Sequence, residues 1–129
     1  MNAIKANNIP LWTTIFALIL GLFCFAGGVM GLIDPTSVTD YATGADNLAS
    51  AWAGRMAGTG AALLVAVWLR SSGAYAAAFA ASIFRELGDL IAAMSGTAEG
   101  FPLPVVAVVL LIDVVAFVIA VRATRRAYG

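Results

Sequence analysis

Residues Leu103–Val121 read LPVVAVVLLIDVVAFVIAV, a run in which Asp113 is the only polar side chain. As a helix, a run of about 20 apolar residues crosses the ~30 Å hydrocarbon core of a bilayer. Three earlier stretches have a similar length and character: Leu11–Ile33, Leu48–Leu69 and Ser72–Met94. The sequence therefore predicts an all-α fold, a bundle of four transmembrane helices that forms one integral membrane domain over residues 1–129.

Composition agrees with this class and excludes several others. Of the 129 residues, 62% are hydrophobic and 11% are charged, against ~25% charged in soluble domains. The net charge is zero, so we expect no surface for nucleic acid. With no histidine and only Cys24, an intrachain disulfide, paired-cysteine redox chemistry and the usual haem and zinc sites are not expected. We predict no cofactor and no metal.

The first stretch, Leu11–Ile33, has two interpretations, a cleaved signal peptide or a retained span. Its 23 residues exceed the ~7–15 residue core of a signal peptide. Phe23 precedes Cys24, where a lipoprotein cleavage site needs a small residue. We interpret this stretch as a true membrane span.

The basic residues predict the orientation of the chain. With four spans, five of them fall on one side of the membrane: Lys5, Arg70, Arg122, Arg125 and Arg126. Acidic residues of the connections fall on the other side: Asp34, Asp40, Asp46 and Glu99. Cytoplasmic loops carry the excess of Lys and Arg. We therefore predict a multi-pass protein of the plasma (inner) membrane with both termini in the cytoplasm.

Five charged residues interrupt the predicted spans: Arg55, Arg85, Glu86, Asp89 and Asp113. Each costs about 2.5–3.5 kcal/mol at the centre of a bilayer on insertion scales. At ~1.5 Å per helical residue, all five lie ~8–15 Å below the outer surface. They are therefore expected to meet in one buried polar site in the outer half of the bilayer.

Helical spacing assigns faces to these residues, because positions three and four apart lie on one face. Ser82, Arg85, Glu86 and Asp89 form one stripe, in which Arg85 and Asp89 are spaced to pair. Arg is always ionised in proteins, so Arg55 must contact a carboxylate or extend outward to the interface, and ~10 Å is beyond the comfortable reach of its side chain. Asp89 is the nearest to it in depth.

The site is predicted to hold two groups of residues. The candidate ligand-binding residues are Arg55, Arg85, Trp52, Thr59 and Ser82. The candidate acids and bases are Asp113, Glu86 and Asp89. Two arginines against three carboxylates leave one carboxyl without a cation, and Asp113, the deepest, is the one expected to carry a proton. Trp52, Phe84 and Phe101 are expected to line a pocket for a lipophilic molecule.

Three functions fit this pattern. The leading one is binding of a small lipophilic ligand, with acid–base chemistry such as isomerisation, cyclisation or hydrolysis. The alternatives are a structural or accessory membrane subunit held by buried salt bridges, and a small proton-coupled or anion transporter acting as an oligomer. Whether the protein is an enzyme stays open.

The expected partners are membrane lipids, a lipophilic small molecule and a second copy of the chain. Small residues repeat every four positions in the second stretch, as Ser50, Gly54 and Gly58 and as Ala53, Ala57 and Ala61. Such repeats let helices approach closely. We favour packing within the chain over a homodimer face.

Two short motifs accompany this plan. Arg55–Gly60 reads RMAGTG in the second stretch, and Arg85–Asp89 reads RELGD in the third. In these motifs and in its four-span plan, which covers the whole chain, the protein resembles the small bacterial four-helix membrane proteins of the DoxX-like kind. Many of those are domains of unknown function. The resemblance therefore implies the fold and a buried charged site but no particular activity.

Overall fold

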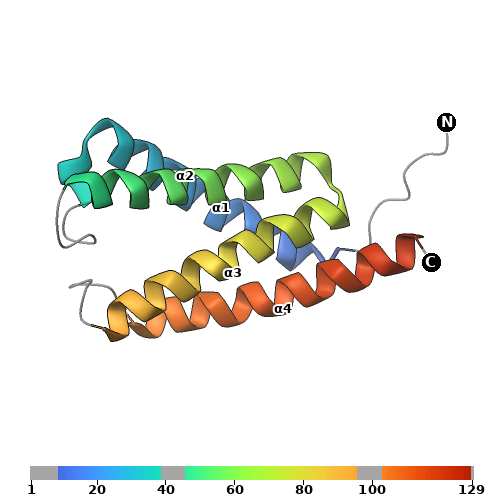
Figure 1. Cartoon of the computed structure of the whole chain (residues 1–129). Coiled ribbons are helices and arrows are strands. Elements are labelled where there is room, and N and C mark those ends of the chain that lie inside the picture. The colour runs from blue at the N-terminus through green and yellow to red at the C-terminus, as the bar shows by residue number, and fades with distance from the viewer. Residues whose placement is uncertain (1–8, 39–45, 96–102, 129) are drawn as a thin grey trace.

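The computed structural model describes residues 9–38, 46–95 and 103–128, and most of these residues lie in helices (Figure 1). The four long helices are α1 (Leu11–Ile33), α2 (Asp46–Leu69), α3 (Ser72–Met94) and α4 (Leu103–Tyr128). A short 3-10 helix, η1 (Pro35–Val38), follows α1. These described residues contain no β-strand, so the all-α prediction is confirmed for them.

The helix bounds match the predicted stretches, with one large difference. α4 continues past Val121 to Tyr128, because its last residues are mostly Ala and Arg, which favour helix. η1 follows α1 at Pro35–Val38, and α2 begins at Asp46. Residues 39–45, between them, lie outside the described residues.

Side chains and backbone at the helix ends set the turns. The Asp34 carboxylate, just after α1, accepts hydrogen bonds from the Thr36 backbone N–H (3.1 Å) and hydroxyl (2.6 Å). Arg70 ends α2 with φ of 49°, the left-handed conformation that commonly terminates a helix. α3 therefore returns directly alongside α2.

α1 and α2 form the closest helix pair, because glycines let their backbones touch. A Cβ added to Gly28 of α1 would lie 2.2 Å from the backbone nitrogen of Ala57. A Cβ added to Gly60 of α2 would lie 2.3 Å from the backbone nitrogen of Phe25. The Ala53–Ala57 repeat thus packs within the chain, as predicted. Gly58 faces the other way, with nothing within 4 Å of an added Cβ.

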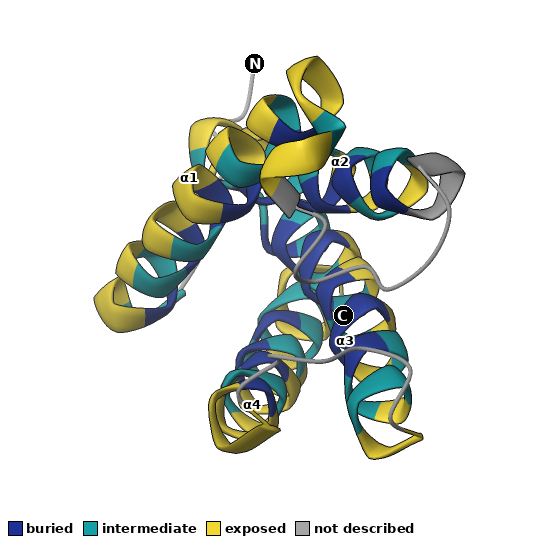
Figure 2. Ribbon diagram, turned by 90° about the vertical axis from the view of Figure 1, so that its left-hand side faces the viewer, coloured by how far each residue is buried: buried dark blue, intermediate teal, exposed yellow. Residues whose placement is uncertain are grey.

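α3 and α4 form a second antiparallel pair, and Figure 2 shows it below the α1–α2 pair. The two pairs meet in a core of mostly small and aromatic residues: Ala17, Leu63, Ala66, Tyr75, Ala78, Phe79, Ala116 and Ala120. Phe16 of α1 stacks on Phe79 of α3 with ring centroids 6.2 Å apart. The Tyr75 hydroxyl donates to Thr14 at 3.2 Å. These contacts tie α3 to α1.

Among the described residues, three helices are long and apolar enough to cross a membrane: α1, residues 49–69 of α2, and α4. Their outward faces carry many exposed Leu, Ile, Val and Phe side chains. α3 has a similar length but contains three charged residues, and it does not qualify on the same grounds. The molecule is therefore built as a membrane protein.

Candidate functional site

An ion pair joins α2 to α3. Nη2 of Arg55 donates to Oδ1 of Asp89, and the two residues lie 34 positions apart in the chain. Gly88 leaves room for the guanidinium, since a Cβ there would lie 3.2 Å from Nη1 of Arg55. Trp52, one turn before Arg55, interacts with the same carboxylate. The predicted contact between Arg55 and Asp89 is thus present.

This ion pair sits at the edge of the bundle rather than in its centre. The Asp89 side chain is 8% exposed, but the Arg55 side chain is 43% exposed. Ala51 and Gly58, which lie four residues before and three after Arg55, are also exposed. The guanidinium therefore stays accessible from outside the bundle beside small residues.

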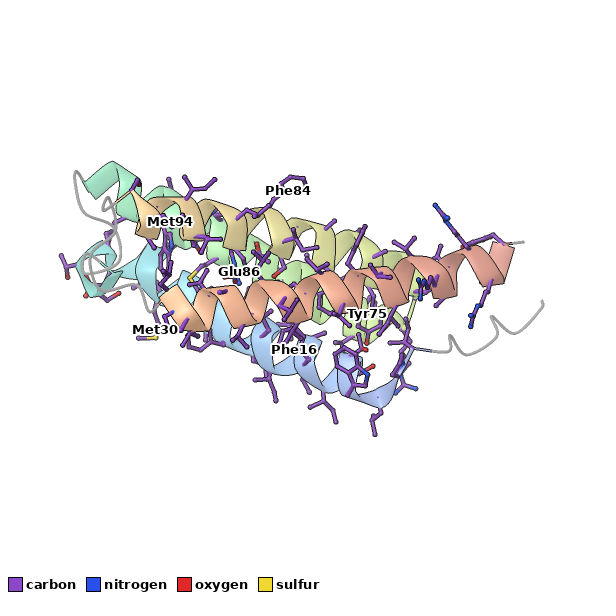
Figure 3. The ribbon with its side chains drawn as sticks, turned by 90° about the horizontal axis from the view of Figure 1, so that it is seen from below. Phe16, Met30, Tyr75, Phe84, Glu86 and Met94 are labelled. Atoms are coloured by element: carbon purple, nitrogen blue, oxygen red, sulfur yellow. The ribbon has the colours of Figure 1, made fainter. Side chains whose placement is uncertain are left out.

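Arg85 of α3 lies deeper in the bundle and contacts its neighbour Glu86 and a residue of α1. Its Nη2 donates to Oε1 of Glu86 and its Nη1 donates to Sγ of Cys24 in α1. Figure 3 shows Glu86 between the helices. The expected pairing of Arg85 with Asp89 is wrong: in the described part of the chain the ion pairs are Arg55–Asp89 and Arg85–Glu86. Arg85 points toward α1, and Asp89 is bound by Arg55.

Asp113 of α4 is fully buried and, unlike Glu86 and Asp89, has no ion pair with an arginine in the described part of the chain. The Ser82 hydroxyl donates to its Oδ2 at 2.5 Å. Its Oδ1 has no hydrogen-bond partner among the described residues, and neither does Nε of Arg85. Ser82, which binds Asp113, and Arg85 are three residues apart on one helix face. The unpaired Oδ1 of Asp113 and the unpaired Nε of Arg85 therefore lie in the same region.

Two further predicted residues lie on α2 and α3. The Thr59 hydroxyl donates to the backbone oxygen of Arg55 at 2.9 Å, within its own helix, and its role as a ligand-binding residue stays a prediction. Phe84 is 76% exposed and points away from the bundle (Figure 3), so its predicted place in a pocket is wrong. Phe101 lies outside the described residues.

The sequence interpretation missed Cys24 as a member of the site. It sits in an apolar run of the sequence, and its type and position alone do not predict a polar contact. A signal was available, because Cys24 and Arg85 each lie 13 residues after the first residue of their helices, Leu11 and Ser72. α1 and α3 run in the same direction, so equal counts place both residues at the same depth.

The arrangement offers a defined set of chemical groups. Across α1, α3 and α4 it provides a thiol, a hydroxyl, a buried guanidinium and a carboxyl with one free oxygen. Within the described ranges, no three Cys, Asp or Glu side chains gather closely enough to hold a metal ion. The polar groups that are present suit hydrogen bonding and proton transfer.

Comparison of the chain with family models, with curated proteins and with solved structures found no match. The resemblance to the DoxX-like membrane proteins therefore stays a prediction.

Proposed function

We propose that the protein is a four-span plasma-membrane protein that binds a small lipophilic molecule at its Arg/carboxylate site, in the outer half of the bilayer. The crossing of α3 is supported by its place beside α2 and α4. Its three charged residues are all buried and are each in an ion pair. Paired charges inside a bundle are the form in which membranes tolerate them.

The orientation is supported by the end of α4. Arg122, Arg125 and Arg126 lie there, at the same end of the molecule as Arg70 in the turn between α2 and α3 (Figure 1). The positive-inside rule then places this end in the cytoplasm.

The observation that carries the ligand proposal is the unsatisfied pair of polar atoms, Oδ1 of Asp113 and Nε of Arg85. Each such buried atom costs about 1–3 kcal/mol. A ligand that carries both a donor and an acceptor satisfies both atoms at once. Since apolar helix faces surround the region, the rest of that ligand is expected to be lipophilic.

Asp113 is the residue best suited to acid–base chemistry. Glu86 and Asp89 each contact an arginine, which stabilises their charged forms, whereas Asp113 contacts the neutral Ser82 hydroxyl. In an isomerisation, the Asp113 carboxyl gives its proton to one carbon of an alkene. The resulting carboxylate then removes a proton from a neighbouring carbon. The step balances without another reactant, and Ser82 holds the carboxyl in place.

The test is to replace Asp113 in two ways. Asp113→Val removes both oxygens and matches the neighbouring valines, so it should abolish ligand binding while leaving the thermal midpoint unchanged or higher. Asp113→Asn keeps a donor and an acceptor, so it should retain the ligand but lose proton transfer. Native mass spectrometry of the protein in nanodiscs reports the bound molecule, and Asp34→Asn, at an exposed aspartate, is the matched control.

A structural or accessory role is the second candidate, and the direct Arg55–Asp89 contact between two helices favours it. Under that role, no small molecule accompanies the wild-type protein. Asp113→Val then leaves the set of molecules bound in native mass spectrometry unchanged. The two outcomes separate the two functions.

A further inference from the structure

The last two turns of α4 carry three arginines: Arg122, Arg125 and Arg126. All three are exposed, and none forms an ion pair with any residue in the described ranges. Tyr128, which follows them, is 88% exposed. This end of the helix therefore presents an unneutralised positive surface.

Arg122 and Arg125 lie on the same outward face of α4 as a row of exposed apolar side chains. Its outward face carries exposed apolar side chains at spacings of three and four: Val108, Leu111, Val115 and Val118. Arg122 lies four residues after Val118, and Arg125 lies three after Arg122, so both extend this outward face. The opposite face carries Asp113, Ala116 and Ala120 and packs into the bundle. The arginines thus face the surrounding lipid and not the protein.

Helix length places these arginines at the membrane surface. Leu103–Val121 rises ~28 Å, which nearly fills a ~30 Å hydrocarbon core. Arg122 then lies at the boundary and Arg126 ~6 Å beyond it, in the headgroup layer. Trp12 in the first turn of α1 and Trp68 in the last turn of α2 are exposed at the same end, as expected for residues at a membrane interface.

We propose that the arginine-bearing end of α4 (Arg122, Arg125 and Arg126) binds the phosphate groups of anionic phospholipids. The planar guanidinium contacts two oxygens of a phosphate at once. The apolar stripe below it packs against the acyl chains of the same lipid. This proposal rests on α4 crossing the membrane, and it is independent of the ligand proposed for the Asp113 site.

The experiment titrates delipidated full-length protein in neutral detergent with phosphatidylglycerol or phosphatidylcholine, and native mass spectrometry counts the bound lipid. The wild type should prefer phosphatidylglycerol by about fivefold per arginine, which corresponds to about 1 kcal/mol each. The preference should shrink as salt is added, because salt screens exposed charges. R122Q/R125Q/R126Q should lose it, and R122K/R125K/R126K, which keeps the charges but not the two-oxygen contacts, should retain only part of it.

Two controls decide whether the surface is correctly located and identified. Arg70→Gln removes a basic residue at the same end but from a different turn, and it should leave the lipid preference nearly intact. Glycerol phosphate, which has no acyl chains, should not compete at the same concentration. The proposal is overturned if the wild type binds the two lipids equally or if the triple Gln variant keeps the preference. It is also overturned if Arg70→Gln loses the preference or if glycerol phosphate competes.

Discussion

Arg55 carries a permanent charge on a helix face that remains accessible from the surroundings of the bundle. The side chain of its partner Asp89 is almost fully buried, so only the Arg55 side of the ion pair is exposed. An ion pair in a medium of low dielectric interacts strongly, but taking both charges out of water opposes that gain. The main energetic effect of this pair is therefore expected when one partner is lost and the other remains alone.

The first residue-scale prediction is that Arg55 and Asp89 are energetically coupled. Arg55→Ala and Asp89→Asn should each destabilise the protein, and the double variant should be less destabilised than the sum, by about 0.5–3 kcal/mol. Unfolding monitored by circular dichroism in detergent measures all four proteins of the cycle.

The control for this cycle is a carboxylate on the same helix that binds a different arginine. Glu86 contacts Arg85, so Arg55→Ala and Glu86→Gln should add with little coupling. Strict additivity of Arg55→Ala with Asp89→Asn would show that the ion pair contributes no interaction of its own.

Depth was enough to predict one contact of the site but not the others. Arg55 and Asp89 were matched because their positions along two antiparallel helices give nearly equal depths. The partner of Arg85 was not predictable in this way, since Glu86 and Asp89 both lie within its reach. The rotation of α3 against α1 decides between them, and that rotation depends on packing across the whole helix pair.

At the scale of the element, the α1–α2 pair depends on glycines that allow backbone contact. Lipid tails are as apolar as Leu, so helices in a membrane gain little from burying apolar surface and rely on close packing. Gly28 and Gly60 provide this packing on the two sides of the pair. The sequence showed the repeat of small residues but not which of its faces is used.

The element-scale prediction compares two glycines. Gly28→Ala places a methyl group 2.2 Å from the Ala57 backbone nitrogen, so the helices must separate, at a cost of about 1–3 kcal/mol or more. Gly58→Ala meets nothing within 4 Å and should be neutral or stabilising by up to about 1 kcal/mol. Thermal midpoints in the same detergent measure both. Equal losses of thermal stability in the two variants would contradict the assignment of Gly28, and not Gly58, to the α1–α2 contact.

At the scale of the whole molecule, hydropathy predicted the helices well because each apolar stretch has the length of a membrane crossing. Leu11–Ile33 and Ser72–Met94 coincide with α1 and α3. Hydropathy missed the end of α4, since Arg122–Tyr128 is polar but still favours helix. Local helix preference, and not burial, sets that boundary.

The whole-molecule prediction concerns the direction of the chain in the membrane. Cysteines introduced at Ser37 and Ser95 should react with an impermeant thiol reagent added to intact cells. A cysteine at Tyr128 should react only after the membrane is permeabilised. The native Cys24 is buried, so the unmodified protein supplies the background. If Tyr128→Cys is labelled in intact cells and Ser37→Cys and Ser95→Cys are not, the chain has the opposite orientation.

The ion pair between α2 and α3 also sets an order of events during synthesis. Asp89 follows Arg55 by 34 residues, so at ~5–20 residues per second the ribosome adds it roughly 2–7 s later. During that interval the ribosome adds the rest of α2 and most of α3. All residues of the α1–α2 glycine contacts are therefore made before the carboxylate that binds Arg55. We expect the α3–α4 pair to join the α1–α2 pair as Asp89 neutralises Arg55.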